Sequence, residues 1–186
     1  MLHDIMATPT GILDLFYVYG NGSWKYICTC RNAVMYSGAD IAAMAIKGDS
    51  GGVVNTLYLE YKNGTPTLPS IGRDRSTTYY TGLASTYGYV RVPVTASATS
   101  ATSAYYTGNK VTFTGMTDGT TEGPASITDG VSYFFGGALV ASPDFTDSTQ
   151  DVLFSSSAFT DGTGALVSIP KIANAQIGVQ WSVTFN

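Results

Sequence analysis

The sequence is short of charge. Only 12% of its 186 residues are Asp, Glu, Lys or Arg, about half the share that soluble globular domains usually carry. Glycine, serine, threonine and 13 tyrosines take the place of the missing charges. Freely diffusing proteins more often keep a charged surface that repels other copies. The composition therefore favours a protein that packs against copies of itself or against a partner lattice.

Histidine, the usual acid or base at neutral pH, is almost missing. His3 is the single histidine, so most acid–base schemes lack their usual group and the protein is predicted not to be an enzyme. The run GDSGG at 48–52 matches the surroundings of the nucleophilic serine in trypsin-like proteases. That chemistry needs a histidine base and an orienting carboxylate, so we interpret the run as a glycine-rich turn. An Asp/Glu catalytic pair is the enzymatic alternative that remains.

Cysteine is scarce as well. Cys28 and Cys30 are the only two cysteines. In an extended strand their Cα atoms lie about 6.5 Å apart, near the upper limit for a disulfide. No second pair of Cys or His ligands completes a zinc site. We therefore expect buried free thiols and a reducing compartment.

Long apolar runs and basic clusters are also missing. No stretch reaches about 18 apolar residues, and Lys25 is the first basic residue, so neither a membrane helix nor a secretory signal is predicted. The net charge is −4 and the pI is near 4.7, which argues against a nucleic-acid-binding surface. We expect no membrane partner, no nucleic-acid partner and no cofactor.

Short strand patterns separated by turn signals make up most of the chain. The runs GILDLFYVY at 11–19 and WKYICTC at 24–30 flank the turn signal GNGS and predict a hairpin. Alternation in the second run places Trp24, Tyr26, Cys28 and Cys30 on one face. Further strands are predicted at 53–61, 77–83, 87–94, 110–115, 130–141, 151–159, 165–169 and 177–185.

About ten short strands with little helix predict an all-β fold. We expect one antiparallel β-sandwich domain over 1–186, jelly-roll-like or immunoglobulin-like, with at most one short helix near residues 39–46. Residues 1–10 are expected to form a flexible N-terminal arm. The uncharged tract at 95–107 is expected to form a long loop or arm.

The candidate interface residues are arginines and paired tyrosines. The arginines form the densest basic group, and they can pair with Asp74 and Glu60 or reach an acidic neighbouring subunit. Tyrosine is enriched at protein interfaces. The predicted interface set is Arg73, Arg75, Arg91, Tyr79, Tyr80, Tyr105 and Tyr106.

Two other kinds of site stay open. The aromatic residues of the strands can serve as core and subunit contacts, or as a platform on which a carbohydrate stacks. The acidic loop with Asp144, Asp147 and Asp151 offers oxygen ligands of the kind that calcium prefers, but it lacks the spacing of an EF-hand. Aspartates in turns are common for backbone reasons alone.

Several runs carry a family resemblance. NTLYLEYKNGTP at 55–66, the YYxxL of 79–83 and GYVRVPV at 88–94 resemble small virion proteins encoded near the capsid and tail genes of tailed bacteriophages. GNKVTFTG at 108–115, a Ser-Pro-Asp-x-x-Asp turn, a VLFSS strand and a closing strand with one tryptophan are similar to their C-terminal portions. The resemblance spans 53–186 and transfers no functional residue by position.

The resemblance implies a non-enzymatic structural protein of the phage particle. The expectation is a head decoration or minor capsid protein, assembled in the host cytoplasm and located in the virion. Its expected partners are itself, as a trimer or higher homo-oligomer, and the major capsid or other virion proteins. The alternative is a neck, tail or fibre component, including a carbohydrate-binding or receptor-binding sandwich. Buried or subunit-facing rings favour the former, and an exposed ring cluster beside carboxylates favours the latter.

Overall fold

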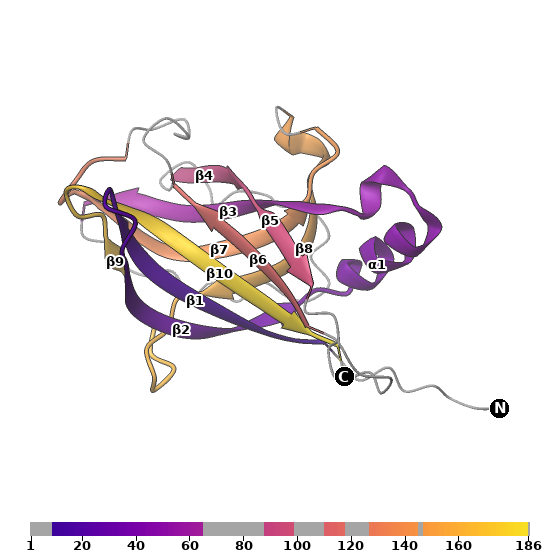
Figure 1. Ribbon diagram of the computed structural model, residues 1–186, viewed down its shortest axis with the longest axis horizontal. Coiled ribbons are helices and arrows are strands. Elements are labelled where there is room, and N and C mark those ends of the chain that lie inside the picture. The colour runs from indigo at the N-terminus through magenta and orange to yellow at the C-terminus, as the bar shows by residue number, and fades with distance from the viewer. Residues whose placement is uncertain (1–8, 65–87, 99–109, 118–126, 145–146, 186) are drawn as a thin grey trace.

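The computed structural model describes residues 9–64, 88–98, 110–117, 127–144 and 147–185. They form strands, one α-helix, α1 (Ser37–Lys47), and two short 3-10 helices, η1 (Ser50–Gly52) and η2 (Ser148–Gln150) (Figure 1). The strands are β1 (Thr10–Tyr19), β2 (Trp24–Val34), β3 (Val54–Asn63), β4 (Gly88–Pro93), β5 (Thr95–Ala98), β6 (Lys110–Met116), β7 (Ser132–Ala141), β8 (Val152–Ala158), β9 (Ile169–Pro170) and β10 (Ala175–Thr184).

The strands form two antiparallel five-stranded sheets that pack together, which confirms the predicted β-sandwich. One sheet has the order β4-β3-β7-β8, with β9 paired to β7, and the other has the order β2-β1-β10-β6-β5. A short ladder between β2 and β8 joins the two sheets: Ala33 pairs with Ser156, and Val34 pairs with Ser155. In Figure 1 the second sheet lies nearer the viewer, and α1 projects from one end of the sandwich.

The core lies between the sheets and follows the period-2 alternation of the strands. Leu57 and Leu59 of β3 face Leu13 of β1 and Trp181 of β10, and each of these side chains is completely buried. Alternation in the closing run predicts an inner row of Ile177, Val179, Trp181, Val183 and Phe185. The first four are buried, and Phe185, just after β10, is partly buried against the core. Alternation is therefore sufficient to predict the inner face of the closing strand.

One predicted face is wrong. Trp24 and Tyr26 do not share a face with Cys30, because the register between β1 and β2 shifts at Leu15/Phe16 and leaves Ile27 as an extra residue in β2. Such a β-bulge reverses the side-chain alternation along the strand. Cys30 is buried in the core, whereas Trp24 and Tyr26 are exposed on the outer face.

The expected loop at 95–107 also needs correction. Its first four residues form β5, which pairs with β6 from Thr95↔Thr114 to Ala98↔Val111. The small, uncharged side chains of Thr95–Ala98 give no strand pattern, and pairing with β6 stabilises this strand instead. The remainder of that tract and residues 1–8 of the expected arm lie outside the described residues.

The single predicted helix is confirmed, and α1 is slightly longer than the predicted range 39–46. Ser37 and Gly38 are buried at its start, where Ser37 Oγ donates to the Leu153 carbonyl at 2.5 Å. It ends at Lys47 and is followed by the C-cap Gly48, whose φ of 79° favours glycine. Within the described ranges, no helix has the length and apolarity needed to span a bilayer.

Candidate functional site

The outer face of the β2-β1-β10-β6-β5 sheet carries an ordered pattern of apolar and polar rows. Strand register sets these rows, because residues opposite each other on neighbouring strands point to the same side. An apolar row crosses the sheet through Tyr26, Phe16, Gly178 and Met116. A polar row lies beside it through Thr29, Asp14, Gln180, Thr114 and Thr95. Asp14 is the only charged residue in the two rows.

Three aromatic side chains gather at one end of the apolar row, and we call them the ring platform: Phe16, Trp24 and Tyr26. The Phe16 ring meets Trp24 edge-on with the ring centroids 5.3 Å apart, and it meets Tyr26 in the same manner at 6.0 Å. Trp24 remains 40% exposed and Tyr26 remains 56% exposed. The edge-to-face contacts fix the rings relative to one another while leaving their outer sides open to solvent.

Gly178 makes room for this arrangement. A Cβ atom on Gly178 would lie 2.5 Å from Cγ2 of Val18 and 3.1 Å from the Trp24 ring. The indole therefore crosses over the backbone of β10, where any other residue would displace it. The Trp24 ring therefore lies directly against the sheet.

A hydrogen-bonded chain links the platform to the carboxylate. The hydroxyls of Tyr26 and Thr29 lie 2.9 Å apart, and Thr29 Oγ1 donates to Asp14 Oδ1. Among the described residues, no partner occupies Asp14 Oδ2. One carboxylate oxygen thus orients the tyrosine through threonine, and the other is available as an acceptor.

The outer face of the other sheet is organised differently. Tyr58 of β3 is completely buried there and donates to Asp151 Oδ2. Arg91 of β4 pairs with the same carboxylate at 2.9 Å, and its guanidinium lies over the Tyr58 ring, 5.6 Å from the centroid. Burial, and then the hydrogen bond to Asp151, raise the pKa of the Tyr58 phenol above its usual value. Met35, Ala138, Val140 and Leu153 pack beside Tyr58.

Of the predicted interface residues, only Arg91 lies in the described part of the chain. Its guanidinium is paired with Asp151 of the same chain and also donates to Ser142 Oγ at 2.9 Å. Asp151 is a carboxylate partner that the sequence did not suggest. Arg73, Arg75, Tyr79, Tyr80, Tyr105 and Tyr106 lie outside the described residues, and their interface role stays a prediction.

The acidic loop uses two of its aspartates for structure. Asp147 caps η2 by accepting from the Thr149 N–H at 2.9 Å and from its hydroxyl at 2.7 Å, and these bonds lower its pKa. Asp151 is buried against Arg91. In the part of the chain that the structure describes, no three His, Cys, Asp or Glu side chains gather as metal ligands.

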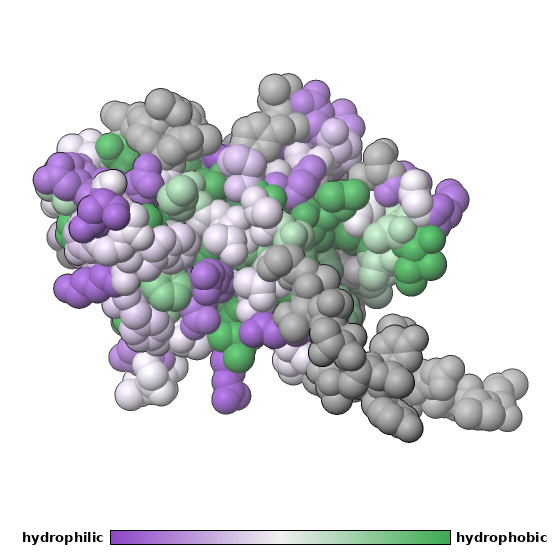
Figure 2. All heavy atoms as spheres, in the orientation of Figure 1, coloured by the Kyte–Doolittle hydropathy of each residue, from purple (hydrophilic) through white to green (hydrophobic). Residues whose placement is uncertain are grey.

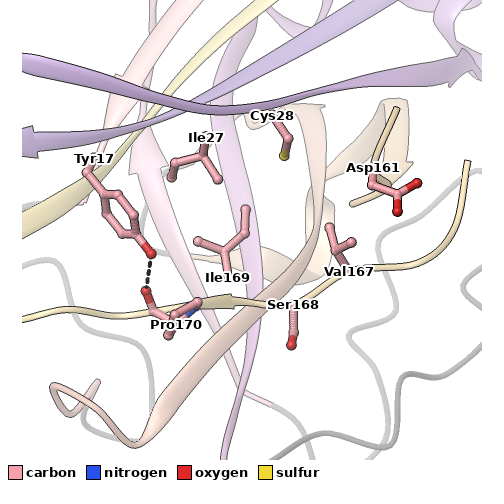
Figure 3. A pocket seen from close by; sticks show the side chains of 8 residues that line it. All are labelled: Tyr17, Ile27, Cys28, Asp161, Val167, Ser168, Ile169 and Pro170. Carbon is pink, nitrogen blue, oxygen red and sulfur yellow. Dashed lines mark hydrogen bonds between the residues drawn. The ribbon is translucent and has the colours of Figure 1, made fainter. Parts of the chain in front are cut away.

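A shallow pocket of about 240 Å³ lies at one end of the sandwich between β1, β2 and β9 (Figure 3). Its walls are mainly apolar, and the Tyr17 hydroxyl donates to the Pro170 carbonyl at its edge at 2.8 Å. The Asp161 carboxylate accepts from the Thr163 hydroxyl and N–H, which lower its pKa. The Asp161 carboxylate thus accepts hydrogen bonds within its own turn.

The two thiols are free, as expected. Cys28 Sγ lies 3.9 Å from Cys30 Sγ, and Cys30 also accepts from the Thr160 N–H at 3.3 Å. The hydrogen bond with Cys28, followed by the one from Thr160, lowers the pKa of Cys30 to about 7. Cys30, which ionises more easily, is 1% exposed, so the accessible thiol is Cys28, whose pKa is raised.

The outer half of α1 presents an apolar surface that the sandwich does not cover. Ile46 is 90% exposed, Met44 is 40% exposed and Val53, just after η1, is 54% exposed. Figure 2 shows hydrophobic residues gathered at the α1 end of the molecule, whereas most of the sheet face beside it has intermediate hydropathy. We give the name helix-end patch to Met44, Ile46 and Val53, which are all exposed at the end of the sandwich from which α1 projects. Met44 and Ile46 are two positions apart and therefore point to different sides of the helix.

Comparison with known proteins identifies no family for this chain. The chain matches no family model, no curated protein and no solved structure. The site therefore has to be argued from geometry. The sequence had suggested exposed rings beside carboxylates as one alternative. It could not identify the bulge that turns Trp24 and Tyr26 outward or the register that brings Phe16 between them.

Proposed function

We propose that this protein is a non-enzymatic structural component of a tailed-phage particle, a head decoration or minor capsid protein that associates with its own copies and with the capsid lattice. The helix-end patch is the observation that carries the proposal. A soluble monomer gains nothing from an almost fully exposed isoleucine at the tip of a projecting helix, whereas a subunit interface buries it.

The patch is built to meet a surface closely. Between Ile41 and Lys47 the helix has only alanine, methionine and isoleucine, so this stretch itself presents no charge to a neighbour. The adjacent Lys47 and Asp49 pair with each other at 3.9 Å and lie at the edge of the contact. The small alanines permit close approach of another backbone. Methionine adapts its shape to irregular partners.

The helix is also held rigidly enough to act as a contact. A Cβ on Gly52 of η1 would lie 2.2 Å from the Ala45 backbone nitrogen, so η1 packs directly against the helix backbone. Gly38 lies close to Phe154 of β8, although less closely than Gly52 lies to Ala45: a Cβ on Gly38 would be 3.1 Å from the Phe154 carbonyl oxygen. A preorganised contact loses little conformational entropy on association.

Assembly multiplies such a modest contact. A patch of three apolar side chains is too small for a tight complex between two isolated proteins. In a closed symmetric lattice the same contact recurs in every subunit, and linked contacts raise the overall affinity far above that of one. Low surface charge reduces the repulsion between neighbouring copies.

The proposal is tested by quantitative mass spectrometry of particles from a phage that encodes this chain. We expect the chain in multiple copies per particle, and separated heads and tails distinguish a head position from a neck, tail or fibre position. Ile46→Glu should lower its copy number about tenfold or more, because a carboxylate buried at the contact is unpaired. Val131→Glu, at a 44% exposed valine away from α1, is the matched control.

Two results would overturn the proposal. One is the absence of the chain from purified particles. The other is incorporation of Ile46→Glu at the wild-type copy number while both variants unfold at the wild-type denaturant concentration.

A further inference from the structure

We infer that the ring platform and Asp14 form a binding site for pyranose sugars of an uncharged glycan. The inference is independent of the proposed function, because it concerns the outer face of the β2-β1-β10-β6-β5 sheet rather than the helix-end patch. It follows from the pairing of an apolar row with a parallel row of hydroxyl, amide and carboxylate groups.

A pyranose ring has the same two-sided chemistry. One face presents C–H groups that stack on aromatic rings, and the edge presents hydroxyls that donate and accept hydrogen bonds. On the protein, Trp24 and Tyr26 are 40% and 56% exposed, which leaves ring surface for such stacking. Phe16 lies between them with centroid separations of 5.3 and 6.0 Å.

The polar row begins one position away along β1. Asp14 is two residues from Phe16 on the same face, about 6.5 Å along the strand, which is roughly the width of one sugar ring. Asp14 Oδ1 accepts from Thr29, while Oδ2 has no partner within the described ranges. Gln180, opposite Asp14 on β10, adds an amide that both donates and accepts.

The site is arranged before any ligand arrives. The bond between the Tyr26 and Thr29 hydroxyls orients the phenol, and Thr29 in turn fixes the Asp14 carboxylate. The absence of a side chain at Gly178 leaves room for the indole of Trp24 against β10, where the Phe16 ring contacts it. Rigid aromatic and carboxylate groups need little reordering when they bind, which raises affinity for a weakly interacting ligand.

Other occupants fit these features less well. A nucleic acid would bring phosphates towards the Asp14 carboxylate, which repels them. A second copy of the chain would cover the polar row together with the apolar one, and it would have to supply hydrogen-bond partners for Asp14, Gln180 and the threonines. A neutral sugar uses both rows and requires no charge on its own side.

Tryptophan fluorescence tests the inference directly, because Trp181 is completely buried and Trp24 is the exposed tryptophan. The probes are maltohexaose, cellohexaose, mannohexaose and chitohexaose, added to the full-length protein. We expect at least one of them to protect Trp24 from acrylamide quenching, with a Kd of about 1 mM or tighter. Calorimetry with the same sugar should show about tenfold weaker binding for Asp14→Asn and none for Trp24→Ala.

The matched control is Tyr36→Ala, which removes a 63% exposed ring from outside the platform and should leave binding unchanged. The inference is overturned if none of the four sugars protects Trp24 at about ten times that Kd, or if Trp24→Ala binds like the wild type. It is also overturned if Trp24→Ala lowers the solution mass and no sugar binds, because the face is then a contact between copies. None of these three results affects the Ile46→Glu test of the proposed function.

Discussion

Each outer face of this sandwich carries a tyrosine linked to an aspartate, but the pair is buried on one face and in contact with solvent on the other. On the β4-β3-β7-β8 face, Tyr58 bonds directly to Asp151 and both are buried beneath Arg91. On the β2-β1-β10-β6-β5 face, Tyr26 reaches Asp14 through Thr29 and stays in contact with solvent.

The difference comes from what covers each face. On the first face, Arg91 bonds to Ser142 and to Asp151, the residue after η2, and its guanidinium lies over the Tyr58 ring. A covered tyrosine and carboxylate belong to a second, smaller core and contribute to stability. An uncovered pair contributes little to stability, so its arrangement is better explained by binding.

Breaking the covered ion pair should have the largest effect. Arg91→Met leaves the Asp151 carboxylate, which is 1% exposed, buried without its cation, and we expect the free energy of unfolding to fall by about 3–5 kcal/mol. Urea unfolding followed by circular dichroism measures it. Lys171→Met, which breaks the more exposed 2.7 Å pair with Asp129, is the control and should cost no more than about 1 kcal/mol. Equal losses of unfolding free energy in the two variants would contradict the larger contribution that we assign to the buried Arg91–Asp151 pair.

Removing one hydroxyl from each face sharpens the comparison. Tyr58→Phe deletes a buried hydrogen bond to a carboxylate and should cost about 1–3 kcal/mol. Tyr26→Phe deletes an exposed one and should stay within about 0.5 kcal/mol of the wild type. The same urea experiment reports both. A larger loss for Tyr26→Phe would show that the open face, not the covered one, carries the stability.

Alkaline pH provides a gentler test of the covered face. Burial and the bond to Asp151 raise the pKa of Tyr58 in the folded state, so above about pH 10 the unfolded chain loses this proton while the folded chain keeps it. The stabilisation is complete below that pH and declines above it, by about 1.4 kcal/mol per pH unit. Between pH 9 and 11, the free energy of unfolding should fall less steeply with pH for Tyr58→Phe than for the wild type. Identical slopes would argue against a buried, protonated phenol.

Local patterns predicted much of the sandwich. The Gly-Asn-Gly-Ser turn and its flanking runs predicted the β1–β2 hairpin. Proline cannot donate to a strand ladder and is confined to edge strands and strand ends, and Pro93 is the last residue of β4, the edge strand of its sheet. The register between β3 and β7 shifts at Phe135, next to Gly136 and Gly137.

The functional surfaces depend on long-range packing, which the sequence does not display. Arg91 finds Asp151 60 residues later in the chain, and nothing near either residue indicates the pairing. The bulge at Ile27 decides whether Trp24 faces the core or the solvent. A bulge of this kind has no turn signature, because the cross-strand partner, not the local sequence, determines it. Likewise, the exposure of Ile46 follows from where α1 leaves the sandwich.

The most direct test of the account is the solution mass of the purified protein by light scattering, for the wild type and for Ile46→Glu. Self-association through the helix-end patch predicts a trimer or larger closed assembly for the wild type and a shift towards monomer for the variant, with unchanged unfolding. A wild type that stays monomeric at every concentration, or a variant of the same mass as an oligomeric wild type, would contradict the account.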